Sequence, residues 1–131
     1  MKPYTPIYDD DAFDVLITEA LEQLPEEFID RLKDNISILL ADMPSDGNPN
    51  LYGVTIQSTK PRWWPTVIYL YRQNIEQRLS ENPHDKNNIR RHILEVLFHE
   101  LGHVMGMDEE TITRLMSEQQ FVSRMEEGSK I

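Results

Sequence analysis

Residues 93–107 read ILEVLFHELGHVMGM, and the pattern of this run indicates how the chain packs and where its site lies. When the run is placed on a helix, six of its apolar residues fall within an arc of about 140°, and they are Ile93, Leu94, Leu97, Phe98, Leu101 and Val104. The two histidines, His99 and His103, lie on the opposite side. A helix of this kind packs against a core along one face and presents both imidazoles on the other. We therefore expect a helix over residues 88–105.

The five residues from His99 to His103 match the H-E-x-x-H pattern of zinc hydrolases. Residues four apart on a helix lie about 40° apart around the axis and about 6 Å apart along it, so both imidazoles can reach one ion. Glu100 is turned about 100° from His99, toward a water on that ion, where a carboxylate can act as a general base. The pattern predicts His99 and His103 as zinc ligands and Glu100 as the catalytic residue.

A catalytic zinc site usually has three protein ligands, so a third is needed. Gly106 can end the helix in a left-handed conformation and turn the chain back toward the ion. Glu109 then takes the place of the last ligand in the H-E-x-x-H-x-x-G-x-x-H pattern, as a carboxylate instead of an imidazole. Glu109 also fits as an acid in the first turn of the next helix, and Asp108 fits either as its N-cap or as the ligand. The more distant acids that remain open as ligands are Glu118, Glu126 and Glu127.

The rest of the chain divides into helices, strands and turns by its periodicity. Apolar residues at helical spacing predict helices over residues 11–24, 25–32 and 108–125. Short apolar or β-branched runs predict strands over residues 35–41, 51–60 and 66–71. Residues 80–88 are polar and predict a loop, whereas residues 72–79 fit neither pattern clearly. We expect one α+β domain over residues 1–131, with two N-terminal helices, a small sheet, the motif helix and a C-terminal helix.

The composition excludes several classes of protein. With 131 residues, 39% hydrophobic and 27% charged, the chain has the composition of an ordinary globular domain. It lacks both the roughly 20-residue apolar run that crosses a bilayer and an apolar secretion signal, so we expect a cytoplasmic protein without membrane contact. The net charge of −10 argues against nucleic acid as a partner. Because there is no cysteine, His, Asp and Glu are the only strong metal ligands. For the oligomeric state, a monomer is the default expectation.

One basic and aromatic segment stands out in this acidic chain. Residues 61–92 carry six basic and three acidic residues. If the strand at residues 66–71 has a free edge beside the site, a peptide can add to it as a further strand. Trp63 and Trp64 fit an exposed lip for such a peptide and a place in the core equally well. The basic residues that would favour acidic or carboxy-terminal parts of the peptide are Arg62, Arg72 and Arg78.

Three further side chains lie near the motif in sequence. His92 is about 10 Å from His99 along the helix, too far to share an ion, and we expect it at the surface or lining a cleft. Glu95, about one turn before His99, fits either as a solvated acid or as a group that orients that imidazole. His84 lies beside a proline in the predicted loop and is expected to have no role.

Over about residues 11–118 the chain resembles the short bacterial zincin-like metallopeptidases. The resemblance rests on residues 20–28, 35–44 and 68–72, and above all on residues 97–110, LFHELGHVMGMDEE. It implies a minimal zincin fold, Zn²⁺ as the cofactor and a peptide or protein as the substrate. His99, Glu100 and His103 stand at the positions of the family's motif, and its acidic third ligand matches Glu109, with Asp108 adjacent.

The chain also departs from the family's pattern. Members usually have a further histidine directly after the motif, where this chain has Val104, and they have Asp more often than Glu as the third ligand. Residues 45–66 match poorly, so the resemblance identifies no substrate-binding residue.

The sequence is compatible with three functions. The first is a zinc-dependent metallopeptidase that hydrolyses peptide bonds through a water activated by Glu100. The second is a non-catalytic module that binds a metal or a peptide on the same scaffold, because 131 residues leave little material for a deep cleft that excludes water. The third is a structural α+β protein in which the motif arose by chance.

Overall fold

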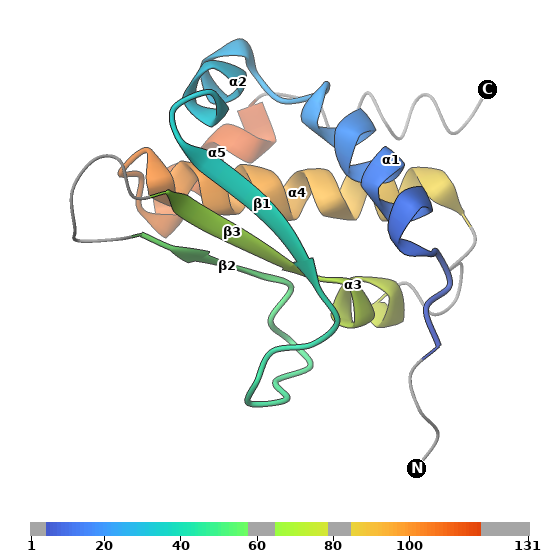
Figure 1. The fold of residues 1–131 in the computed structure, drawn as a ribbon. Helices are drawn as coiled ribbons and strands as arrows, with labels where there is room; N and C mark the ends of the chain where they lie inside the picture. Colours follow the sequence, from blue (N-terminus) through green and yellow to red (C-terminus); the bar gives the residue numbers. More distant parts are fainter. Residues whose placement is uncertain (1–4, 58–64, 79–84, 119–131) are drawn as a thin grey trace.

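The computed structural model describes residues 5–57, 65–78 and 85–118, and Figure 1 shows their arrangement. These residues form an α+β structure of helices and one small mixed sheet, as predicted. The elements are α1 (Asp10–Leu21), α2 (Glu26–Leu32), β1 (Ile36–Ala41), β2 (Gly53–Ile56), β3 (Thr66–Tyr71), α3 (Arg72–Arg78), α4 (Lys86–Val104) and α5 (Glu109–Glu118). None of the helices in these ranges has the combination of length and apolar character that a membrane span requires.

The sheet has the strand order β1-β3-β2. Strand β3 pairs in parallel with β1 and antiparallel with β2, so both of its edges are occupied. A peptide could add to the strand at residues 66–71 only if it had a free edge, and this condition is therefore not met. A strand made almost entirely of β-branched and aromatic residues is stabilised most by the central position, where Ile68 and Leu70 are fully buried. The edge strand nearest to α4 is β2.

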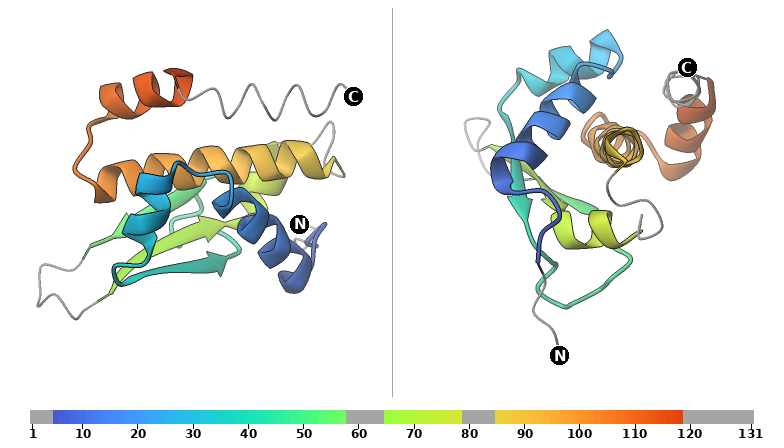
Figure 2. Two further views of the ribbon diagram at one scale, coloured as in Figure 1. Left: turned by 90° about the horizontal axis from the view of Figure 1, so that it is seen from above. Right: turned by 90° about the vertical axis from the view of Figure 1, so that its right-hand side faces the viewer.

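Helix α4 crosses one face of the sheet and lies between the sheet and α5 (Figure 2). The apolar face predicted for this helix is buried, and Phe98 stacks on Phe28 of α2 with ring centroids 4.4 Å apart. Helix α1 packs along α4 through its own apolar stripe. The fully buried residues that α4 contributes to the core are Ile89, Ile93, Leu94, Leu97, Phe98 and Leu101.

The two N-terminal helices form close to where the sequence predicts them. Asp9 is the N-cap of α1, and its side chain accepts a hydrogen bond from the Ala12 amide at 2.8 Å. Pro25 takes the N-cap position of α2, where a missing N–H costs nothing. The C-terminal helix is described as far as Glu118, and the predicted remainder up to residue 125 lies outside the described residues.

The segment between β3 and α4 differs from the prediction. Residues 72–78 form α3, which the polar sequence did not indicate, and α4 begins at Lys86, inside the predicted loop. Several residues of α3 are buried although they are polar, and hydrogen bonds compensate for the loss of water, as at Asn74. Asn74 Nδ2 donates to the carbonyls of Asn48 and Leu51 at 2.8 and 2.7 Å, so it anchors the segment that leads into β2.

Arg72 has a structural position and does not flank a binding edge. Its guanidinium is paired with Asp10 and with Asp42, the latter at 2.7 Å, and only 9% of its side chain is exposed. It ties the first turn of α1 to the end of β1. The predicted role of Arg72 in recognising acidic peptides is therefore not supported, and Arg62, Trp63 and Trp64 lie outside the described residues.

Candidate metal centre

The motif histidines lie on the face of α4 that points away from the core. The rings of His99 and His103 are one helical turn apart, with centroids 4.7 Å from each other. Their side chains are 38% and 35% exposed, whereas Leu97 and Leu101 on the other face are fully buried. The periodicity of the sequence predicted this division because it follows from helix geometry alone.

The chain turns back immediately after the second histidine. Gly106 has φ of 84°, in the left-handed region that favours glycine. The amide of Gly106 donates to the His103 carbonyl at 3.0 Å, and the amide of Met107 donates to the Gly102 carbonyl at 2.9 Å. These two bonds form a Schellman motif, which ends α4 and directs the next helix back along it.

The turn brings Glu109, the first residue of α5, to both histidines. Its two carboxylate oxygens lie 2.6 Å from His99 Nε2 and 2.8 Å from His103 Nε2. The hydrogen bonds with His99 and His103 hold the pKa of Glu109 below its usual value. One potential ligand atom from each of the three residues lies within 4.8 Å of the others. The structure thus brings together the three residues predicted as ligands.

The alternative third ligands lie elsewhere or outside the described residues. Asp108 caps α5, since its side chain accepts from the Thr111 amide at 2.8 Å, and hydrogen bonds with the side chain and the amide of Thr111 lower the pKa of Asp108. Glu118 is exposed near Arg114, and Glu126, Glu127 and His84 lie outside the described residues.

The donor set fits zinc. Two imidazole nitrogens and one carboxylate oxygen are ligands that catalytic zinc sites commonly combine, with a further position left for water. All three side chains reach solvent, because Glu109 is 67% exposed and both imidazoles are more than one third exposed. An ion could therefore enter without unfolding of the surrounding helices.

Glu100 is held differently from the three exposed residues. Its side chain is only 10% exposed, and Oε1 lies 3.8 Å from Nδ1 of His99. The other oxygen, Oε2, accepts a hydrogen bond from Oγ1 of Thr55 on β2 at 2.7 Å. Sequence reasoning missed Thr55, because nothing local marks a threonine 45 residues away as a partner of the motif.

Gly102, between the two histidines, has a packing role. Its close neighbour is a side chain of the next helix, α5. A Cβ at this position would lie 2.6 Å from Cγ1 and 2.8 Å from Cδ1 of Ile112, which is fully buried on α5. The absence of a side chain lets α5 approach α4 closely enough for Glu109 to reach the histidines.

We expect Gly102→Ala to lower the free energy of unfolding of the metal-free protein by about 1 kcal/mol. Overpacking against Ile112 costs about 1–3 kcal/mol, and the better helix propensity of alanine returns up to about 1 kcal/mol of this. Urea unfolding measures the difference. In an Ile112→Ala background the added methyl group has room, so the same substitution should cost nothing there. An equal loss in both backgrounds would contradict the packing explanation.

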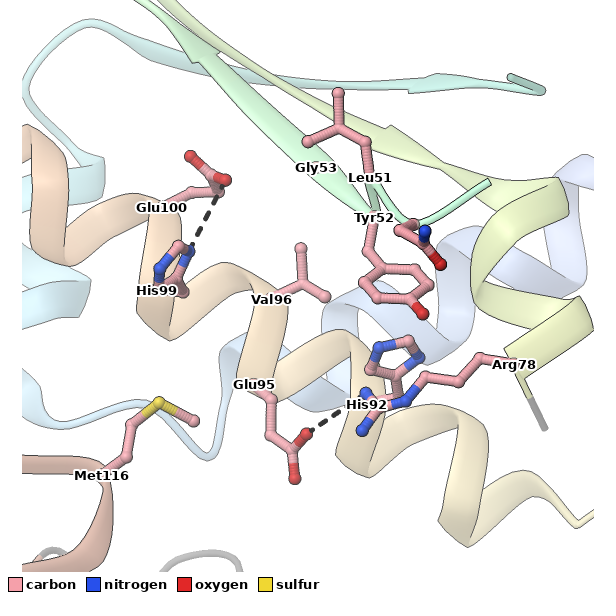
Figure 3. Close-up of a pocket in the computed structure, with 11 residues that line it drawn as sticks. Leu51, Tyr52, Gly53, Arg78, His92, Glu95, Val96, His99, Glu100 and Met116 are labelled. Carbon is pink, nitrogen blue, oxygen red and sulfur yellow. Dashed lines mark ion pairs between the residues drawn. The ribbon is translucent and has the colours of Figure 1, made fainter. Parts of the chain in front are cut away.

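A pocket of about 280 Å³ adjoins Glu100 and His99 (Figure 3). It lies between α4 and the segment that leads into β2, and its walls are largely apolar, with Leu51, Tyr52 and Val96 among them. Arg78 closes the far end, 5.5 Å above the ring centroid of Tyr52 and 3.7 Å from Glu95. Glu95 thus points toward Arg78, which does not support a role for it in orienting His99.

His92 is part of this pocket and is not at the surface. It is only 3% exposed, and its ring packs edge-on against Tyr52 with centroids 4.7 Å apart. Burial, aided by the nearby charge of Arg78, lowers the pKa of His92 to about 3, so the ring is neutral at physiological pH. The expectation that His92 lines a cleft agrees with this position.

No curated protein sequence matches the chain significantly. A family model described as zincin-like metallopeptidase matches residues 33–118, which include the sheet, the histidine motif and Glu109. Since the match covers well over half of the chain, the protein belongs to the zincin-like metallopeptidase family.

Proposed function

We propose that the protein is a zinc-dependent metallopeptidase in which His99, His103 and Glu109 hold the ion and Glu100 is the general base. The observation that carries this proposal is the convergence of three ligand side chains from two helices beside a shielded carboxylate. Structural roles alone do not explain three exposed, mutually facing metal-binding groups next to an apolar pocket.

The residues divide the reaction between them. When bound, Zn²⁺ would polarise the substrate carbonyl and acidify a water molecule. Glu100 takes a proton from the attacking water and passes it to the leaving amine, which is the ordinary task of a positioned carboxylate. Its low exposure shields it from bulk solvent, and the hydrogen bond from Thr55 restrains one of its oxygens.

The substrate is a peptide that lies extended along the outer edge of β2, beside α4. Within residues 5–57, 65–78 and 85–118, strand β2 pairs with β3 along one edge and has no strand on the other, and an extended peptide commonly adds to a free strand edge. The apolar pocket beside Glu100 then receives one side chain next to the scissile bond. This moves the expected peptide-binding edge from β3 to β2.

The pocket predicts a preference among substrates. In a series of otherwise identical peptides, leucine at the position next to the scissile bond should give a kcat/KM about tenfold higher than alanine, since burial of extra methylene groups contributes about 1–3 kcal/mol to discrimination in an apolar pocket. Aspartate at that position should give a value below that of alanine. Initial rates for the three peptides measure this. Equal rates for all three would show that the pocket receives no substrate side chain.

Two measurements on the wild-type protein test the proposed function. The first is the metal content of protein purified without chelator and then supplied with micromolar zinc. The second is digestion of a broad peptide library by the zinc-loaded protein, with products identified by mass spectrometry. The proposal expects about one zinc per chain and discrete cleavage products. Absence of bound zinc would falsify the proposal.

The openness of the site favours a second candidate, a metal- or peptide-binding module without turnover. Glu109 is 67% exposed and the adjoining pocket is small, so the described residues enclose a substrate less completely than deep peptidase clefts do. This candidate expects zinc to raise the melting temperature while the peptide library remains intact.

A further inference from the structure

We propose that Thr55 is a positioning residue for Glu100: its hydroxyl holds one carboxylate oxygen so that the other faces the reacting water. The inference deepens the proposed function and rests on it. Oγ1 of Thr55 lies 2.7 Å from Oε2 of Glu100, and the two residues come from different elements, β2 and α4. The contact therefore fixes the carboxylate relative to the sheet, not only relative to its own helix.

The close approach of β2 to α4 depends on Gly53, two residues before Thr55. Alternate residues of a strand face the same side, so Gly53 and Thr55 both face α4. A Cβ on Gly53 would lie 2.7 Å from Cγ1 of Val96 and 3.5 Å from Cγ of Glu100. A larger residue there would require the strand or the Val96 side chain to shift. Gly53 thus brings β2 close enough for the threonine hydroxyl to reach the carboxylate.

The strand that carries Thr55 is itself fixed. Thr55 is in register with Ile68 of β3, which is fully buried, and Gly53 is in register with Leu70. The chain before β2 is held by the two hydrogen bonds from Asn74. The hydroxyl is therefore presented from a strand that is held by its pairing with β3 and by the hydrogen bonds from Asn74 on α3.

The hydrogen bond has a direction that matters for chemistry. A threonine hydroxyl has one proton and donates it here, because an ionised carboxylate only accepts. Oε2 is thus held by the hydroxyl, and Oε1, which lies 3.8 Å from Nδ1 of His99, is the oxygen to which the proposal assigns proton uptake. Without the bond, the Glu100 side chain gains rotamers that direct the carboxylate away from the site. Misplacement of a reacting group by about 1 Å can reduce a rate about 10²-fold.

The test compares Thr55→Val, which keeps the shape and removes the donor, with Thr55→Ser, which keeps the donor. We expect Thr55→Val to lower kcat about 10–100-fold with KM and zinc affinity within about threefold of wild type. Thr55→Ser should restore kcat to within about threefold of wild type. Thr66→Val at the start of β3 is the matched control, and Thr55→Ala replaces the valine variant if that variant does not fold.

A second readout does not depend on turnover. In the metal-free protein, side-chain scalar couplings measured by NMR should show one dominant rotamer of Glu100 in the wild type and in Thr55→Ser, and averaging among rotamers in Thr55→Val. If wild-type protein binds zinc but cleaves nothing, the proposed function fails, while this measurement still decides the role of Thr55. Wild-type kcat in Thr55→Val, equal loss in the serine and valine variants, or an unchanged Glu100 rotamer in the valine variant would overturn the proposal.

Discussion

Replacing Glu100 by glutamine is expected to lower kcat by about 10²–10⁴-fold, the range that a positioned general acid or base contributes. Glutamine has nearly the same size, and its carbonyl oxygen can still accept the hydrogen bond from Thr55. The amide cannot take up a proton from water, however. The substitution therefore removes the chemistry and leaves the packing of α4 in place. Steady-state hydrolysis of a peptide selected from the library digest measures the effect.

The loss of kcat identifies the general base only if Glu100→Gln still folds and still binds zinc. Zinc content and melting temperature of Glu100→Gln should equal those of the wild type, because Glu100 is not one of the three proposed ligands. Glu110→Gln, which removes an exposed carboxylate on α5, is the matched control and should keep full activity. If Glu100→Gln retains more than about one tenth of the wild-type kcat, another group takes the proton and the assignment of the general base is wrong.

The sequence predicted the features of the site that depend on local geometry. Spacing along one helix places His99 and His103 together and puts the apolar residues on the other face. The glycine at position 106 indicated a left-handed turn, and from that turn the spacing placed Glu109 as a candidate ligand. Each of these steps spans fewer than about a dozen residues, over which backbone geometry is nearly determined by helix and turn rules.

The features that sequence reasoning missed depend on contacts between distant segments. Strand β2 has only four residues, so its pattern is too short to show which side faces α4 or that Thr55 meets Glu100. The sheet order was equally hidden, because the strand that looked most suited to an exposed peptide-binding edge is stabilised more by the centre.

Helix α3 was missed for a related reason. Its sequence, RQNIEQR, is polar, and polarity usually indicates exposure. Asn74 and Glu76 are nevertheless buried, because Asn74 donates to the carbonyls of a distant loop and Glu76 accepts from the amides of Ile7 and Tyr8. Buried polar groups with partners break the simple pattern of apolar inside and polar outside, and the partners cannot be read from the pattern.

Removing any one of the three proposed ligands is expected to abolish most of the stabilisation by zinc. At a zinc concentration 100-fold above the dissociation constant, binding adds about 2.7 kcal/mol to the free energy of unfolding, or on the order of 10 °C in melting temperature. If His103→Ala weakens binding about 100-fold, the same zinc concentration adds only about 0.4 kcal/mol. His99→Ala and Glu109→Gln should behave alike, because each leaves two protein ligands.

The acids around Glu109 make this experiment specific for the third ligand. Glu110→Gln changes the same charge one residue further along α5 and should keep the full zinc response. Asp108→Ala should lower the stability of the metal-free protein by about 1 kcal/mol through loss of the N-cap, and leave the zinc-dependent shift unchanged. The reverse pattern, with zinc affinity lost in Asp108→Ala and retained in Glu109→Gln, would mean that the first turn of α5 rearranges on binding and that Asp108 is the ligand. Two measurements separate the assignments. Differential scanning fluorimetry with and without zinc reports the stability of the fold, and competition against a chelator of known affinity reports the zinc affinity of the site.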